Sequence, residues 1–178
     1  MVEEIILRPV GIVKSELKEP SLTEDSGDLS KARIDEALRK RERKIRNLIS
    51  EIIIDDKFDG ILDGIEDFSH ILVLYWAHET KGENRNLIKV HPMGRKDLPL
   101  VGVFATCSPV RPNPVLVTAV KLVERNGNVL KVQGFEAIDG SPVIDIKPYN
   151  PHYYLARNVK LSGWMKKIQR EYARKQKL

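Results

Sequence analysis

Cysteine is almost absent from this sequence: Cys107 is the only one among 178 residues. A single thiol cannot form an intrachain disulfide, and it cannot supply the thiolates that hold a structural zinc ion. Long hydrophobic runs are also missing, because residues 71–77 (ILVLYWA) fall far short of the ~20 residues that span a bilayer. The N-terminal MVEEIILRP has acidic residues where a secretory signal carries basic ones. We therefore expect a cytoplasmic protein that does not associate with membranes.

The familiar signatures of nucleotide and cofactor sites are missing as well. The sequence contains no G-x-G-x-x-G fingerprint, no Walker-type phosphate loop, no H-E-x-x-H pair and no recognisable Ser-His-Asp pattern. These absences argue against the common dinucleotide-binding, NTP-hydrolysing and zinc-protease classes, and we expect no metal site.

Basic residues, by contrast, are in excess and unevenly placed. The chain is 42% hydrophobic and 31% charged, as is ordinary for a globular protein, and its formal net charge is +5. Beyond residue 151 the only acid is Glu171, whereas the basic residues there are Arg157, Lys160, Lys166, Lys167, Arg170, Arg174, Lys175 and Lys177. Such a cluster attracts phosphates by releasing counterions. On charge alone, a solvated helical tail is the simpler explanation.

The N-terminal third predicts a strand, a loop and a helix. Residues 5–15 are rich in β-formers but contain a proline and a glycine, which predicts an edge strand or a bulged one. Residues 19–28 are turn-formers and acids, typical of a flexible loop. Residues 29–49 show apolar residues at helical spacing after Ser30, a suitable N-cap, and many charges elsewhere.

The remainder predicts many short strands and a final helix. Residues 69–79 are nearly continuously apolar, as in a strand buried on both faces. Residues 115–124 and 129–136 flank an Asn-Gly pair, a strong hairpin signal. Residues 161–178 predict an amphipathic helix that packs on the body, with an apolar stripe of Leu161, Trp164, Met165, Ile168 and Tyr172.

These elements together predict a mainly β fold, a barrel or a sandwich with helices added. We expect one domain over residues 1–150, which includes the charged helix inserted at about 29–49. We expect residues 151–178 to form a basic extension packed on that domain.

A proline-rich segment, residues 102–114 (GVFATCSPVRPNP), is the first candidate site. Each proline restricts its own φ and holds the preceding residue extended. Arg111 and Asn113 are two residues apart, so an extended chain points both to the same side, where they can recognise a polar ligand. An equally good interpretation is a stiff crossover in which Arg111 caps backbone carbonyls.

The second candidate is residues 139–151 (DGSPVIDIKPYNP), which begin with an Asp-Gly turn. Strand alternation places Ile144, Ile146 and Pro148 on one face, and Val143, Asp145, Lys147 and Tyr149 on the other. A carboxylate, an ammonium and a phenol on one side of an apolar strand favour a site wall. The alternative is an exposed Asp–Lys pair of little energetic value.

Two further residues have simple structural explanations. His78, followed by Glu79, ends the most apolar strand, where a hydrogen-bonded rim histidine is more usual than an acid or a base. Cys107 lies inside the stiff segment, and we expect a buried, inert thiol rather than a nucleophile.

Three blocks closely resemble the signature blocks of the TsaA/TrmO-like family: FSHILVLYWAHE (68–79), GVFATCSPVRPNP (102–114) and DGSPVIDIKPYNP (139–151). The resemblance implies a small TsaA-like β-barrel and a homodimeric, S-adenosyl-L-methionine (SAM)-dependent tRNA methyltransferase. The family's substrate is N6-threonylcarbamoyladenosine beside the anticodon, methylated on N6. The implied cofactor contacts are His78, Glu79, Cys107, Val117, Asp139, Gly140, Ser141 and Pro142.

The sequence departs from the family pattern in three places. Members usually carry arginine where Cys107 stands, and RPNP is usually followed by Ile-Gly rather than by Val115 and Leu116. The Pro-Arg-Gln segment of bacterial members is not visible in residues 19–28.

The resemblance suggests a mechanism in which alignment of donor and acceptor is the main task. We expect Asp145 or Tyr149 to orient the acceptor amine and take its proton, and Asn113 to hold the base edge. We expect the remaining substrate contacts at Arg111, Lys147, Lys166, Lys167 and Arg170, with the helix over 33–46 also near the tRNA backbone. Two alternatives stay open: an RNA-binding barrel that has lost catalysis, and a methyltransferase of a small molecule.

Overall fold

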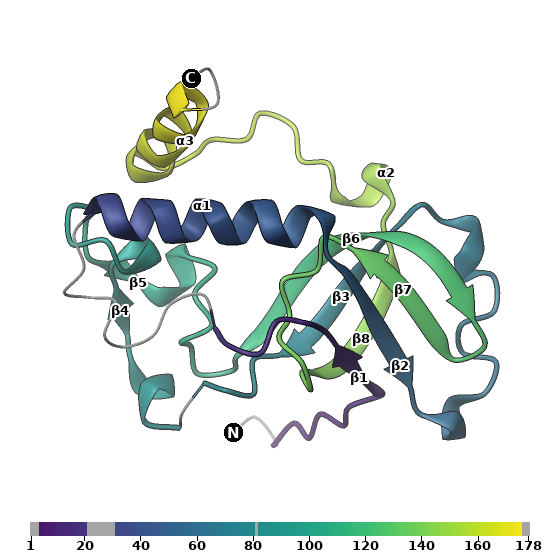
Figure 1. Cartoon of the computed structure of the whole chain (residues 1–178). Coiled ribbons are helices and arrows are strands. Elements are labelled where there is room, and N and C mark those ends of the chain that lie inside the picture. The colour runs from purple at the N-terminus through teal and green to yellow at the C-terminus, as the bar shows by residue number, and fades with distance from the viewer. Residues whose placement is uncertain (1–3, 21–30, 81, 176–178) are drawn as a thin grey trace.

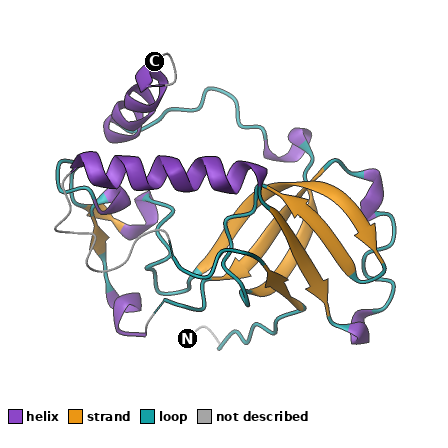
Figure 2. Ribbon diagram, in the orientation of Figure 1, coloured by secondary structure: helices purple, strands orange, loops and turns teal. Residues whose placement is uncertain are grey.

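The computed structural model describes residues 4–20, 31–80 and 82–175. The prediction of a mainly β barrel is confirmed: six strands close in the order β1-β2-β7-β6-β3-β8, every neighbouring pair antiparallel (Figures 1 and 2). The barrel strands are β1 (Gly11–Lys14), β2 (Ile49–Ile54), β3 (His70–Trp76), β6 (Val115–Asn126), β7 (Val129–Gln133) and β8 (Pro142–Pro148).

Outside the barrel lie one small sheet and the helices. Strands β4 (Lys89–Val90) and β5 (Val101–Gly102) pair with each other, beside several short 3₁₀ turns. The helices are α1 (Lys31–Asn47), α2 (Pro151–Tyr154) and α3 (Gly163–Lys175). Figure 1 shows α1 leading into β2 and extending over the β4–β5 side, while a long connection runs from α2 to α3. Both predicted long helices are confirmed within a few residues; Ser30 and residues 21–28 of the predicted loop lie outside the described residues. None of the described helices is long and apolar enough to cross a membrane.

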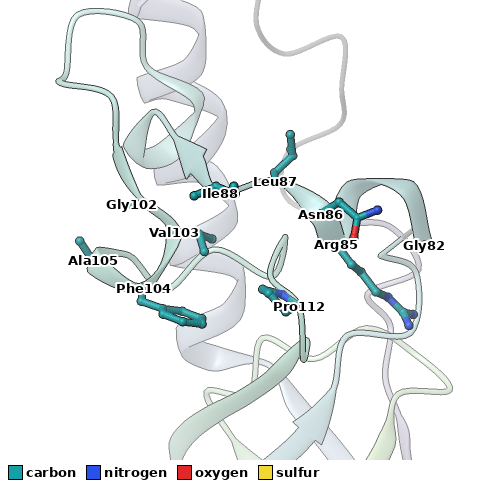
Figure 3. Close-up of a pocket in the computed structure, with 10 residues that line it drawn as sticks. All are labelled: Gly82, Arg85, Asn86, Leu87, Ile88, Gly102, Val103, Phe104, Ala105 and Pro112. Atoms are coloured by element: carbon teal, nitrogen blue, oxygen red, sulfur yellow. The ribbon is translucent and has the colours of Figure 1, made fainter.

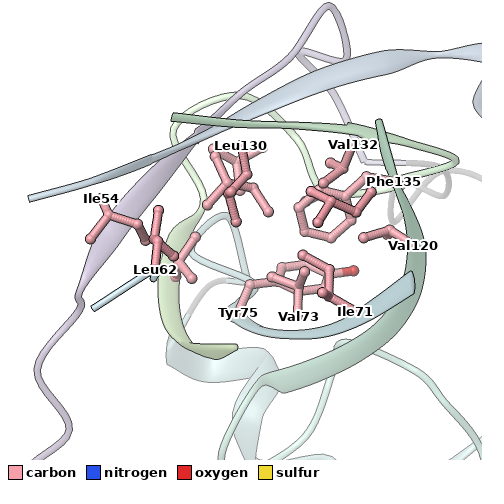
Figure 4. Close-up of a cluster of buried hydrophobic side chains, with 14 residues drawn as sticks. Ile54, Leu62, Ile71, Val73, Tyr75, Val120, Leu130, Val132 and Phe135 are labelled. Carbon is pink, nitrogen blue, oxygen red and sulfur yellow. The ribbon is translucent and has the colours of Figure 1, made fainter. Parts of the chain in front are cut away.

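The core fills the inside of the barrel because alternate residues of each strand point inward. Strand β3 shows this period, with Ile71, Val73 and Tyr75 almost fully buried. The Tyr75 ring meets the Phe135 ring edge-on, with centroids 5.0 Å apart (Figure 4). Of the outward residues of β3, His70 is exposed and the other three are half-buried, so the expected burial on both faces is only partly realised.

The predicted hairpin is confirmed as β6 and β7, with Gly127 at a positive φ of 60° in the turn. The expectation of an N-terminal edge strand is wrong, because β1 pairs with β2 on one side and β8 on the other. Barrel closure leaves β1 no free edge. A Cβ at Gly11 would overlap the carbonyl oxygen of Ile53, so this close approach of β1 to β2 requires glycine.

The alternation predicted for β8 is broken by a bulge. Tyr75 pairs with Val143, whereas Leu74 pairs with Asp145, so one residue of β8 is extra at this point. Val143 is therefore buried in the core and Ile146 packs against it, while Asp145 and Lys147 lie on the outside. The expected shared face of Val143 and Asp145 is wrong, because strand periodicity cannot anticipate a bulge.

Candidate functional site

The two candidate segments meet where β3 ends. The backbone N–H of Ala77 donates to the carbonyl of Pro114 at 2.8 Å, which joins the end of β3 to the proline-rich segment. The next residue, His78, lies against the Asp-Gly turn: a Cβ on Gly140 would be 3.8 Å from His78 Nε2. Segments 102–114 and 139–142, far apart in the sequence, thus flank one histidine.

The 139–142 turn is held firmly by β1 and the residues after it. Gly140 has the positive φ of 75° that the Asp-Gly prediction requires, and its N–H donates to Val13. Asp139 accepts a hydrogen bond from the Ser15 N–H and forms an ion pair with Lys18 at 2.8 Å. Both contacts lower the pKa of the Asp139 carboxyl, and the hydrogen bond from Lys18 contributes more than the one from the Ser15 N–H. The turn is therefore preorganised.

Two polar atoms beside this turn have no partner among the described residues: Nδ1 of His78 and Oγ of Ser141. Ser141 is only 1% exposed. Buried polar atoms in proteins are almost always hydrogen-bonded, so these two atoms have hydrogen-bonding capacity that the described residues do not use. On the solvent side, Glu79 Oε1 lies 3.5 Å from His78 Nε2.

The proline-rich segment is stiffened by Arg111. Its Nε donates to the carbonyl of Ser108 at 2.8 Å, and one terminal nitrogen donates to the carbonyl of Thr106 at 2.7 Å. The structure thus shows the carbonyl-capping interpretation of Arg111, and its expected substrate contact stays a prediction. Asn113 is exposed beside Pro114 at the end of β3. The expectation of a buried Cys107 is wrong, because its side chain is exposed.

Asp145 and Val117 share the outer face of the barrel. Leu74 pairs with Val117 on one side and with Asp145 on the other, so two strand spacings, about 10 Å, separate them. Val117 is 57% exposed. Lys147 Nζ lies 2.6 Å from Asp145 Oδ2, and this carboxylate raises the pKa of Lys147. The strand therefore presents a carboxylate and an ammonium as one outward pair.

Tyr149 lies at the opposite end of β3 from His78. Its N–H donates to the carbonyl of His70, the first residue of the strand, which runs about 20 Å to Trp76. Tyr149 instead stacks on Tyr154, with ring centroids 5.8 Å apart and planes 14° apart. Within one chain, the structure does not bring Tyr149 together with the 102–114 and 139–142 segments.

The basic residues of α3 differ in their surroundings. Lys167 pairs with Asp97 at 3.0 Å, while Lys166 and Arg170 are exposed. The expected packing of the helix stripe is confirmed at Ile168, which is 6% exposed, whereas Leu161 of the expected stripe is 38% exposed and precedes α3. Sequence reasoning missed Arg95, a fully buried guanidinium that fastens α3 to the loop between β4 and β5. A charged residue in a loop carries no sequence signal of burial.

A pocket of about 710 Å³ adjoins the proline-rich segment (Figure 3). Exposed apolar side chains line it, Ile88 and Phe104 among them, and Figure 3 shows Pro112 between Phe104 and Arg85. Arg85 also places its guanidinium 5.4 Å from the Trp76 ring centroid, a cation–π geometry. Among the described residues, no cluster of three or more metal-ligating side chains occurs.

Comparison with known proteins identifies the family. The family model described as the tRNA-methyltransferase O N-terminal domain matches residues 36–154. An S-adenosyl-L-methionine-binding protein from Archaeoglobus fulgidus is 39% identical over 147 residues, which are 83% of this chain and 91% of the relative. The chain belongs to the tRNA-methyltransferase O N-terminal domain family. All three sequence blocks lie inside the matched range, whereas α3 lies beyond it.

Two further relatives are longer proteins, and this chain matches only part of their length. A tRNA (adenine(37)-N6)-methyltransferase from Mus musculus is 37% identical over 110 residues, which are 62% of this chain and 25% of that protein. The crystal structure of TrmO from Pseudomonas aeruginosa shares the fold with a TM-score of 0.62 at 23% identity. That match covers 89% of this chain and 61% of the TrmO chain.

The structure also explains one departure from the family pattern. Leu116, which stands where members usually have glycine, pairs with Tyr75 and packs against the core from inside the barrel. The side chain is therefore accommodated as a packing residue and does not enter the segment that flanks His78.

Proposed function

We propose that this protein is a SAM-dependent methyltransferase that acts on a tRNA adenosine beside the anticodon. The finer proposal for its substrate is N6-threonylcarbamoyladenosine, methylated on N6. One observation carries the proposal: the two segments that the family pattern associates with the cofactor meet at His78 and leave His78 Nδ1 and Ser141 Oγ available to a ligand.

The residues present fit the cofactor. SAM supplies an electrophilic methyl group on a sulfonium and carries amine, carboxylate, ribose and adenine groups that need polar partners. We propose that Ser141 and His78 bind its polar groups, while Asp139, Gly140 and Pro142 form one wall. Val117 offers an exposed apolar surface on the outer face, and the exposed Glu79 and Cys107 are the further proposed contacts.

For the acceptor, the proposed chemistry rests on orientation and proton removal. An exocyclic adenine nitrogen is a weak nucleophile, so a carboxylate placed to accept its proton assists the transfer. Asp145 is half-buried on the outer face about 10 Å from Val117, and its carboxylate pairs with Lys147 Nζ at 2.6 Å. Asn113, exposed beside the other segment, is suited to hold the base edge.

We further propose that the working unit is a homodimer. Tyr149 lies at the far end of β3 from His78, so it cannot serve the cofactor segments of its own chain. A second copy docked on the outer face would let one chain's Tyr149 approach the other's cofactor segments. Because its substrate is a tRNA, we propose that the protein acts in the cytoplasm.

The test is nucleoside mass spectrometry of tRNA incubated with the protein and SAM. We expect a mass increase of one methyl group on a modified adenosine, and none when SAM is omitted. Transcribed tRNA without threonylcarbamoylation should stay unmodified. A methylated unmodified transcript would contradict the substrate assignment, and an unchanged native tRNA pool would contradict the activity.

A second candidate, an RNA-binding barrel without catalysis, is favoured by one observation: an exposed thiol, Cys107, stands where members usually have arginine. Calorimetry with SAM separates the two. Heat of binding at sub-millimolar SAM supports the enzyme, and none at millimolar SAM supports the binding module. Turnover of a small molecule without tRNA would support the third alternative, a small-molecule methyltransferase.

A further inference from the structure

An exposed aromatic surface surrounds α2, at the end of the barrel where β8 finishes. Tyr153 is 77% exposed and Tyr154 is 44% exposed, and Leu155 continues the surface at 74%. A soluble domain rarely leaves adjacent large apolar side chains in water unless they bind something. Tyr154 stacks in parallel on Tyr149, so the surface continues directly into a proposed catalytic residue.

The surface is held in place by its own backbone. Asn150 caps α2 by accepting a hydrogen bond from the His152 N–H at 2.9 Å, and Pro151 occupies the first helical turn. The N–H groups of Tyr153 and Tyr154 both donate to the carbonyl of Asn150. The two rings are therefore presented by an ordered turn, which lowers the entropic cost of binding.

The charge along this segment has one sign. Arg157 and Lys160 are exposed just after α2, and no acidic residue occurs in the sequence between Lys147 and Glu171. Exposed aromatic rings in a segment that carries only cations match a partner that offers flat π faces on a polyanionic backbone. Single-stranded nucleic acid has both properties, whereas paired bases in a duplex do not expose their faces.

We propose that the α2 surface, formed by Tyr153, Tyr154, Arg157 and Lys160, is a stacking platform for unpaired bases of the tRNA anticodon loop. This inference rests on the proposed function, because it takes the same tRNA as partner and places the bases that flank the acceptor beside Tyr149. Tyr153 stacks on a flanking base, and the two cations bind the phosphates that follow it.

The experiment measures RNA binding without SAM, using a fluorescently labelled anticodon stem-loop RNA and fluorescence anisotropy. Tyr153→Ala should weaken binding by roughly 5- to 100-fold, and Tyr153→Phe, which keeps the ring, should stay within about twofold. Arg157→Ala should lower the slope of log Kd against log salt by about 0.7. Ile61→Ala, at another exposed apolar position, is the matched control and should bind as the wild type does.

Each other outcome overturns the platform. Wild-type affinity in Tyr153→Ala excludes stacking, and equal losses in the Ala and Phe variants assign the effect to the phenol hydroxyl. A change of oligomeric state in Tyr153→Ala, measured by sedimentation, would make the surface a contact between copies of the chain. RNA binding is measured without SAM, so the two proposals can fail separately. If Tyr153 is needed for RNA binding but the protein transfers no methyl group to tRNA, the proposed function is wrong and the stacking platform is supported.

Discussion

The guanidinium of Arg95, which is 2% exposed, donates to both carboxylate oxygens of Glu171, at 2.8 and 3.3 Å. The same guanidinium donates to both oxygens of Asp97, at 3.0 and 2.8 Å. One buried arginine thus joins α3 to the loop that follows β4, 76 residues earlier in the chain. The basic helix is therefore fixed to the body and presents its exposed cations from a defined place.

We expect Glu171→Gln to loosen α3. The variant replaces an ion pair with hydrogen bonds to a neutral amide, while Arg95 stays buried and charged. The free energy of unfolding should therefore fall by about 1–2 kcal/mol. Affinity for tRNA should fall as well, because Lys166 and Arg170 lose their fixed place. Urea unfolding and anisotropy with tRNA measure the two effects. Gln169→Ala, an exposed position on the same helix, is the control, and an equal loss in both variants would contradict the clamp.

The same cluster predicts a pH dependence of stability. Arg95, and then Lys167, hold the pKa of the Asp97 carboxyl well below its ordinary value of 3.8. A group with a lowered folded-state pKa stabilises the fold above its unfolded pKa and loses that contribution as the pH falls towards the folded value. We expect wild type to exceed Asp97→Asn in unfolding free energy at pH 7, with a gap that narrows below about pH 4. If the difference in unfolding free energy between wild type and Asp97→Asn did not change with pH, the variant would lose stability through altered packing rather than through the carboxylate charge.

Gly11 should tolerate no side chain. A Cβ there would overlap the Ile53 carbonyl oxygen, so β1 and β2 would have to separate. We expect Gly11→Ala to lower the free energy of unfolding by about 1–3 kcal/mol, the range for overpacked sites. Gly163→Ala is the matched control, since nothing lies within 4 Å of its Cβ position. If thermal unfolding shows that the two variants are equally stable, then β1 and β2 can move apart at Gly11 without loss of stability.

Ser141 provides the sharpest test of the cofactor site. Its Oγ is buried without a partner among the described residues. A ligand group can therefore hydrogen-bond to it without displacing a partner within the protein. We expect Ser141→Ala to weaken SAM binding about 5- to 30-fold by calorimetry, with little change in stability. Unchanged SAM affinity together with higher stability would identify Ser141 as a strained core residue instead.

For the acceptor, Asp145→Asn keeps the shape of the side chain but removes the proton acceptor. We expect kcat for tRNA methylation to fall by about 100-fold or more, with SAM affinity unchanged. Lys147→Met is the companion variant, because it frees the carboxylate from its ion pair while preserving most of the alkyl chain. Full activity of Asp145→Asn in single-turnover kinetics would remove the catalytic assignment.

Local patterns in the sequence were sufficient for much of the fold. The apolar run of β3, the Asn-Gly turn between β6 and β7, and the stripe of α3 are short-range signals, and each predicted element formed. The Asp-Gly turn at Asp139 also formed as predicted, because glycine tolerates the positive φ that Gly140 adopts in this turn. Such features depend on neighbours in the chain and can be inferred from them.

Long-range pairing decided the rest, and it decided what the site residues do. Closure of the barrel gave β1 two partners, and the bulge beside Val143 turned Asp145 outward against the strand period. The partners of Arg111 and Arg95, and the separation of Tyr149 from His78 along β3, likewise depend on which strands lie side by side. Strand register and side-chain partners come from residues distant in sequence, so only the folded chain determines them.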